Sequence, residues 1–389
     1  MKKNKLIATV LITTIAAGSV TANVYAGRSY SLSQNKVSTT TKIGTGSSPS
    51  LEEGEAMTVE AAVARAIERS TTIKTYEDNI EITEDNLDDV RVERLDATEW
   101  NEINSYAISY KQLELQKEDY KDKIEAEKQT IRYNIENYFS TILYMQDYLA
   151  IYDEILDVAA RSLEVTKKQY ELGMISQNEY DQAVNEYNEQ VTSKTTAENS
   201  ISSAYTALNT LLDYNVAATY PVTLDDEETG ESIVVYEPVD KTTLATAVAL
   251  ATSSSNVTIK SLERNVEIAQ YTVDTYSNLY SNDSEIEKTA ALYTATSSLN
   301  NTKLSYEASV KTLYQNILEN EDSYNDLNNQ LTTLQNTMSI YEKQYELGQI
   351  TELALDSYKL EEKQLVLSIQ DTVNTHYFYM QQYENPNLL

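Results

Sequence analysis

The sequence predicts an all-α protein made of two tandem repeats, each a long antiparallel coiled-coil hairpin of helices. Three observations lead to this fold class. The chain of 389 residues has only 8 glycines and 4 prolines, so it is poor in residues that end helices. The prolines leave residues 55–216 and 239–385 uninterrupted. The hexapeptide KQYELG occurs in both stretches, at residues 168–173 and 343–348, which indicates an internal duplication.

The N-terminal 26 residues have the pattern of an export signal. Lys2, Lys3 and Lys5 precede an apolar run over residues 6–17, and small residues before Gly27 suit a cleavage site. The apolar run is shorter than the ~20 residues that a membrane-spanning helix needs, which favours cleavage over an uncleaved anchor. Residues 27–56 are rich in Ser, Thr and Gly and have no apolar period, so we expect a flexible leader there.

The first repeat is predicted at residues 57–214. It opens with TVEAAVARA, which matches TLATAVALA at residues 243–251. A stripe of mostly apolar residues follows, in which the steps alternate between three and four, as is typical of a coiled coil. Its members are Ile135, Tyr138, Ile142, Met145, Leu149, Tyr152, Leu156, Ala159, Leu163, Thr166 and Tyr170.

Each stripe ends at a glycine that is expected to stop the helix. Gly173 and Gly348 stand where a positive φ is often needed, and glycine adopts it without steric cost. Ser176 and Thr351 are then expected to cap the next helix, and Glu179 completes a capping box with Ser176. The repeated hexapeptide therefore predicts a tight turn between two antiparallel helices.

The two repeats are joined by a predicted linker at residues 215–241. It contains two prolines, a run of acids and the β-prone residues 232–236, so we expect at most a short strand in it. The second repeat, at residues 242–385, keeps the stripe of the first when every number is raised by 175. Its members are Val310, Leu313, Ile317, Asn320, Tyr324, Leu327, Leu331, Leu334, Met338, Tyr341 and Tyr345.

Composition limits the possible functions. The chain has 30 basic and 61 acidic residues and no cysteine. Such acidity argues against nucleic acid or an anionic membrane surface as a partner. The only histidine is His376, and the sequence has no glycine-rich phosphate loop and no metal-ligand cluster. We therefore expect no enzymatic activity, no cofactor and no metal.

The duplicated pattern resembles the TolC-type outer-membrane efflux proteins. The resemblance rests on TVEAAVARAIERS, on the turns YELGMISQNEYDQA and YELGQITELALDSY, and on LLDYN at residues 211–215. In that family, three protomers with two helical hairpins each form a tunnel. The resemblance therefore implies a homotrimer in the cell envelope that takes part in transmembrane export.

The resemblance also implies a docking site at the glycine turns. In the family these turns lie at the inner end of the tunnel, where an adaptor (membrane fusion) protein of an efflux or secretion pump docks. The implied contact residues are Gly173, Ile175, Ser176, Gly348, Ile350 and Thr351. The alternative is that these residues only cap helices, and both roles are compatible.

Acids beyond each turn narrow the tunnel mouth in many family members. The matching acids here are Glu179, Asp181 and Asp356, whereas Ala354 stands at the fourth position. Carboxylates in the first turn of a helix are also favoured by the helix dipole alone, and that explanation carries more weight.

One family feature is missing from the sequence. Family members insert a pair of membrane-spanning strands into each half, and such strands need ~10 residues of alternating polarity. The matching windows, residues 91–112 and 271–292, are charged or rich in hydroxyl groups instead. We expect a tunnel-like helical protein without these strands, and the sequence leaves open whether its envelope has an outer membrane.

Two functions from different classes remain after these comparisons. The first is a component of an export duct that docks on an adaptor protein. The second is a coiled-coil spacer of the cell envelope that transports nothing. A closed trimer with a central lumen would favour the duct, whereas dimers or filaments would favour the spacer.

Overall fold

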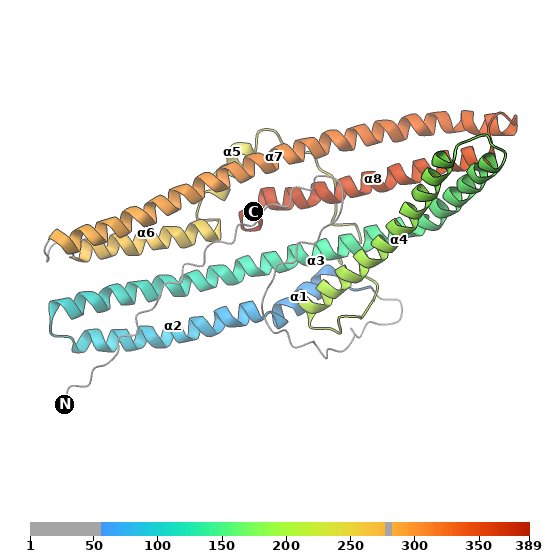
Figure 1. Cartoon of the computed structure of the whole chain (residues 1–389). Coiled ribbons are helices and arrows are strands. Elements are labelled where there is room, and N and C mark those ends of the chain that lie inside the picture. The colour runs from blue at the N-terminus through green and yellow to red at the C-terminus, as the bar shows by residue number, and fades with distance from the viewer. Residues whose placement is uncertain (1–55, 277–281) are drawn as a thin grey trace.

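The computed structural model describes residues 56–276 and 282–389. The expected export signal and all but the last residue of the expected leader lie outside this range. The described chain forms an elongated bundle of long helices (Figure 1). Its described residues contain no β-strand, only isolated bridges that join Met57 to Val222 and Asp225 to Ser232. The all-α fold class is confirmed.

The helices follow the duplicated order of the sequence. The first four are α1 (Val59–Arg69), α2 (Thr71–Asp96), α3 (Trp100–Glu171) and α4 (Gln177–Leu212). The next four are α5 (Leu244–Ala251), α6 (Val257–Tyr276), α7 (Asn282–Glu346) and α8 (Glu352–Glu384), and the 3-10 helix η1 (Pro386–Leu388) follows them. Each of α5 to α8 thus corresponds to one of α1 to α4.

The long helices α3 and α7 bury equivalent parts of their apolar stripes. Ile135 and Ile142 of α3 lie under α1 and α4, in a cluster that includes Leu208. Val310 and Ile317, which correspond to them, pack against α5 and α8 in a second cluster. All four stripe residues are completely shielded from solvent, so the predicted register of the two repeats is confirmed in the middle of each helix.

The linker runs as irregular chain that is fastened to both repeats. The amide of Met57 donates to the carbonyl of Pro221 at 2.8 Å. Farther along, the Tyr236 ring stacks on Tyr324 of α7 with the ring centroids 3.8 Å apart. The amide of Val239 donates to Glu321 of α7 at 2.6 Å. The β-prone residues 232–236 form no strand, in agreement with the expectation of at most a short one.

Residues 91–112 and 271–292, the windows where family members insert strands, are helical in their described parts except at residues 97–99. Helices α2 and α3 pack together and are joined by residues 97–99 alone. In the second window, the described residues belong to the end of α6 and the start of α7. None of the described helices combines the length and the apolarity needed to cross a membrane.

Candidate functional site at the glycine turns

Both glycine turns lie at the same end of the molecule, at the right of Figure 1. The first joins α3 to α4 and the second joins α7 to α8, and the helices of each pair pack against each other. The other ends of α3 and α7 lie far away at the left of the same view. The fold therefore presents the two copies of the repeated hexapeptide together.

The glycines adopt the backbone conformation that the sequence predicts. Gly173 has φ of +70° and Gly348 has φ of +66°. The amide of Gly173 donates to the carbonyl of Tyr170 at 2.9 Å, and that of Met174 donates to Gln169 at 2.8 Å. The second turn repeats both bonds at the same lengths, between residues 348 and 345 and between residues 349 and 344. This is the Schellman arrangement, which satisfies the last carbonyls of each long helix.

The helices after the turns are capped as predicted, but not equally. The Ser176 hydroxyl accepts from the Glu179 amide at 3.4 Å, and the Glu179 carboxylate accepts from the Ser176 amide at 2.7 Å, so the capping box is present. These bonds from the Ser176 backbone and hydroxyl hold the pKa of Glu179 below its ordinary value. Thr351 accepts only a single bond, from the Ala354 amide at 3.2 Å.

The turns expose large apolar side chains that the sequence analysis did not single out. Leu172, Met174 and Leu347 are 75%, 69% and 63% exposed. Leu172 and Leu347 are the leucines of the two hexapeptides, so the repeat itself was the signal that could have found them. Of the other predicted contact residues, Ser176 and Thr351 are exposed, whereas Ile175 and Ile350 are half-buried. The end of the molecule that carries the two turns, here called the turn end, therefore exposes apolar side chains to water.

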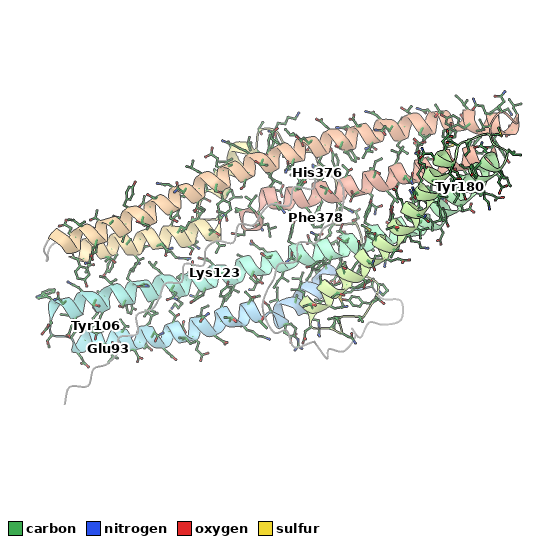
Figure 2. The ribbon with its side chains drawn as sticks, in the orientation of Figure 1. Glu93, Tyr106, Lys123, Tyr180, His376 and Phe378 are labelled. Atoms are coloured by element: carbon green, nitrogen blue, oxygen red, sulfur yellow. The ribbon has the colours of Figure 1, made fainter. Side chains whose placement is uncertain are left out.

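In each hairpin, a stacked pair of tyrosines joins the two helices near the turn. Tyr170 and Tyr180 stack with centroids 5.2 Å apart and planes at 13° (Figure 2 labels Tyr180). Tyr341 and Tyr358 stack at 3.8 Å and 6°. The two pairs do not occupy equivalent positions of the repeats. In each hairpin the stacked rings give an apolar contact between the two helices and leave the tyrosine hydroxyl groups near water. The two contacts lie at different distances from their turns.

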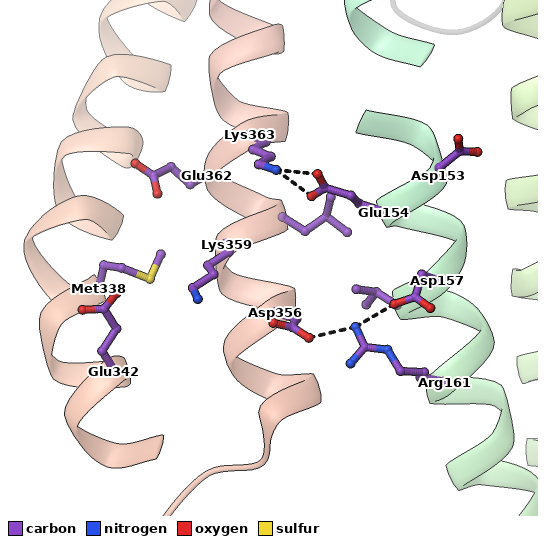
Figure 3. A pocket seen from close by; sticks show the side chains of 12 residues that line it. Asp153, Glu154, Asp157, Arg161, Met338, Glu342, Asp356, Lys359, Glu362 and Lys363 are labelled. Carbon is purple, nitrogen blue, oxygen red and sulfur yellow. Dashed lines mark hydrogen bonds and ion pairs between the residues drawn. The ribbon is translucent and has the colours of Figure 1, made fainter. Parts of the chain in front are cut away.

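A charged groove of about 730 Å³ lies behind the turns, between α3 and the α7–α8 hairpin (Figure 3). Arg161 of α3 contacts Asp356 of α8 at 2.8 Å and Asp157 of its own helix at 2.9 Å. Lys363 of α8 contacts Glu154 of α3 at 2.6 Å. These pairs are partly exposed, so each contributes little stability by itself, but together they fix which faces of the two hairpins meet.

The three predicted mouth acids all have local partners. Glu179 is held in the capping box, and Asp181 accepts from Gln177 at 2.7 Å. Asp356 is bound to Arg161 in the groove. Of the three, only Glu179 lies in the first turn of its helix, where the helix dipole favours a carboxylate, and Asp356 instead links the two hairpins. No cluster of potential ligand residues suited to a metal ion is found in the described part of the chain.

Two buried polar clusters lie farther from the turns, where α3 and α8 meet α1 and the linker. Glu136 is buried, accepts from Tyr377 at 3.0 Å and pairs with Arg132 at 3.1 Å. Burial raises the pKa of the Glu136 carboxyl above its ordinary value, although both partners oppose the shift. His376 lies completely buried in the middle of the bundle, 3.3 Å from Glu321 (Figure 2). Both clusters are held together by partners within the fold.

Comparison with known proteins identifies the fold. No protein-family profile matches the sequence, and a search of curated proteins gives no match. Solved structures do match. The outer membrane protein VceC of Vibrio cholerae has a TM-score of 0.59 and 10% identity over 84% of this chain and 95% of its own. The CmeC outer membrane channel of Campylobacter jejuni has a TM-score of 0.54 and 10% identity over 85% of both chains.

The outer-membrane channel OprN matches in the same way, with a TM-score of 0.53 and 11% identity over 85% of this chain and 89% of its own. At such low identity the likeness is one of fold. The chain has the helical fold of TolC-type outer-membrane efflux channels, as the duplicated hexapeptide led us to expect.

Proposed function

We propose that the chain is a passive component of an export duct and that it docks on an adaptor protein of a transport complex through its two glycine turns. The observation that supports this most is the turn end itself. Two turns of the same backbone geometry lie at one end of the molecule and expose Leu172, Met174 and Leu347 to water. Exposed apolar residues that are grouped in this way favour a protein partner.

The proposed contact surface combines these three side chains with the six turn residues given by the family resemblance. The glycines and caps set the backbone of the turns, and the apolar side chains supply the area that a partner would bury. The protein is proposed to be exported by its N-terminal signal, to act in the cell envelope as a homotrimer and to have no enzymatic activity. The fold of its structural neighbours, which are named as channels, supports this assignment.

The test is capture of a purified adaptor (membrane fusion) protein of an efflux pump from the same organism. Leu172→Glu combined with Leu347→Glu is expected to lower capture at least tenfold, because it places charge in the apolar contact surface. Both side chains are exposed, so helicity by circular dichroism should not change. The matched control is Val235→Glu, another exposed apolar side chain (55%) that lies in the linker and away from the turns, and it should leave capture intact.

Undiminished capture by the double variant would contradict docking at the turns. Electron microscopy of the purified protein tests the duct itself, since a closed ring with a central lumen is expected. Filaments or isolated dimers would instead favour the envelope spacer.

A further inference from the structure

The contact between α3 of the first repeat and α8 of the second changes character along its length. Near the turns it consists of partly exposed ion pairs, such as that of Arg161 with Asp356. Towards the C-terminal end of α8, neutral side chains donate to α3 instead, and the Phe378 ring (Figure 2) lies edge-on to Tyr133. The bonds are Gln382 to Tyr133 at 2.7 Å, Asn385 to Gln129 at 3.1 Å and Tyr377 to Glu136 at 3.0 Å. We call this part of the contact the joint.

Glu136 has the only carboxyl group among the three acceptors of the joint, and it is buried. It is 2% exposed, whereas Gln129 is exposed and Tyr133 is half-buried. One oxygen of the carboxyl accepts from Tyr377 of α8, and the other accepts from Arg132 of α3 at 3.1 Å. A buried carboxylate is costly unless its partners offset the loss of contact with water. The joint therefore contains one group whose charge is in conflict with its surroundings.

The partners of this carboxyl come from three helices. Arg132 lies one turn before Glu136 on α3 and also pairs with Glu60 of α1 at 2.9 Å. Tyr377 comes from α8, where Gln381 donates to its hydroxyl at 2.8 Å. Arg132 stays beside Glu136 whether or not α8 is in place, because both residues belong to α3. Loss of the joint would change only the bond from Tyr377 and the burial of the carboxyl.

The helix α4, which also packs on this part of α3, adds no charge. Its residues 199–212 include no acid and no base, and Tyr205 among them donates to the carbonyl of Tyr220. In this setting, burial raises the pKa of the Glu136 carboxyl above its ordinary value, and the bonds from its two partners offset the shift only in part. Burial is therefore the dominant influence on its charge.

The second repeat has the reverse ion pair, and that pair is in water. When the numbers are raised by 175, Arg132 and Glu136 correspond to Glu307 and Lys311, which pair at 2.6 Å. The side chains of Glu307 and Lys311 are 39% and 57% exposed. A basic residue thus stands where the first repeat has its buried acid. The conflict between charge and burial at this position belongs to the first repeat alone.

We propose that Glu136 makes the joint sensitive to protons, so that α8 binds α3 more tightly when this carboxyl is neutral than when it is charged. Separation of α8 from α3 would admit water to the carboxyl, and hydration favours the charged form far more than the neutral form. The charged form therefore favours separation, and acid fastens the second repeat to the first. Both helices belong to one chain, so the joint does not depend on the proposed duct.

The direction of the pH dependence follows from the burial of Glu136. Because its pKa is raised in the folded protein, its contribution to the joint is fully present below the ordinary carboxyl value of about 4.3. That contribution is lost as the pH rises through the raised value. Tyr377 acts in the opposite sense, because a hydroxyl that donates to a carboxylate favours the charged form.

Hydrogen exchange of the backbone amides at residues 378–384 of the full-length protein tests the proposal. The exchange rate of the wild type is divided by that of Glu136→Gln at each pH, which cancels the direct effect of pH on exchange. We expect this ratio to rise at least about fivefold between about pH 5 and about pH 8, because only the wild type can charge the carboxyl. A ratio that stayed constant or fell over this range would overturn the proposal.

The matched control is Glu307→Gln, which removes the same charge from the equivalent pair of the second repeat. Its ratio to the wild type at residues 378–384 should change by less than about twofold over the same pH range, since Glu307 is partly in water and lies outside the joint. A change as large as that for Glu136→Gln would mean that the charge of the chain, and not the buried carboxyl, governs the joint.

Tyr377→Phe keeps the test decisive if Glu136→Gln does not fold. The variant removes a bond that is stronger to the charged carboxylate than to the neutral carboxyl. Its exchange rate at residues 378–384, divided by that of the wild type, should therefore be at least about twofold higher at pH 8 than at pH 5. An equal ratio at both pH values would show that Glu136 does not change its charge in this range and would also overturn the proposal.

Discussion

The two glycine turns have the same backbone but different side chains around it. Both end a long helix with a glycine at positive φ and the same two hydrogen bonds. The first is followed by the full capping box of Ser176 and Glu179, whereas the second has the single cap of Thr351. The two copies therefore share the glycine turn, which reverses the direction of the chain. They differ in the capping side chains, which only add stability.

The largest effect is expected from truncation of the equivalent buried residues Ile142 and Ile317. Each is completely buried, so Ile→Ala should lower the free energy of unfolding by about 2–5 kcal/mol. The loss should be greater for Ile142, because its cluster extends over α1, α4 and the linker, while that of Ile317 is smaller. Urea unfolding at one protein concentration measures both.

The control for this pair is Val165→Ala, which shortens an exposed side chain of α3 and should change stability by less than about 0.5 kcal/mol. A greater loss for Ile317 than for Ile142 would contradict the ranking of the two clusters.

A smaller and equal effect is expected at the glycines. A Cβ at either Gly173 or Gly348 would meet nothing within 4 Å, so the cost of Gly→Ala comes from the positive φ alone, about 1 kcal/mol. Asparagine tolerates this conformation better, so Gly→Asn should lose less than Gly→Ala at both turns. Thermal unfolding of the four variants checks this, and an unchanged G173A or G348A would show that its turn relaxes to another conformation.

The smallest effect concerns pH and should occur in the first hairpin only. The pKa of Glu179 is lower in the folded protein, because Ser176 donates two hydrogen bonds to the carboxylate. Its stabilising contribution is therefore present above the ordinary carboxyl pKa, near about 4.3, and is lost as the pH falls through the lowered value. The stability difference between wild type and Glu179→Gln should shrink below that pH.

A suitable control for the pH series is Glu189→Gln, an exposed acid in the middle of α4. Its difference from wild type should lack the change in slope. A Glu179→Gln variant whose deficit stayed constant down to the acid transition would mean that the capping box does not form in solution.

The sequence by itself determined the features that depend on neighbours along the chain. The stripe around Ile142 and Ile317 follows from a period of three and four, and the turns at Gly173 and Gly348 follow from the few residues that accept positive φ. The cap at Ser176 likewise needs only residues within one helical turn. Such short-range rules hold wherever the segment lies, so the two helical hairpins were predictable.

Only the tertiary structure decided which faces of the hairpins meet and which remain in water. The pairing of Arg161 with Asp356 spans 195 positions of the chain, and nothing near either residue specifies it. The same holds for buried Glu136 and for the exposed leucines of the turns, which an isolated helix would present alike. Pairing between helices depends on the summed packing and charge of whole faces, so it is settled when the long helices come together.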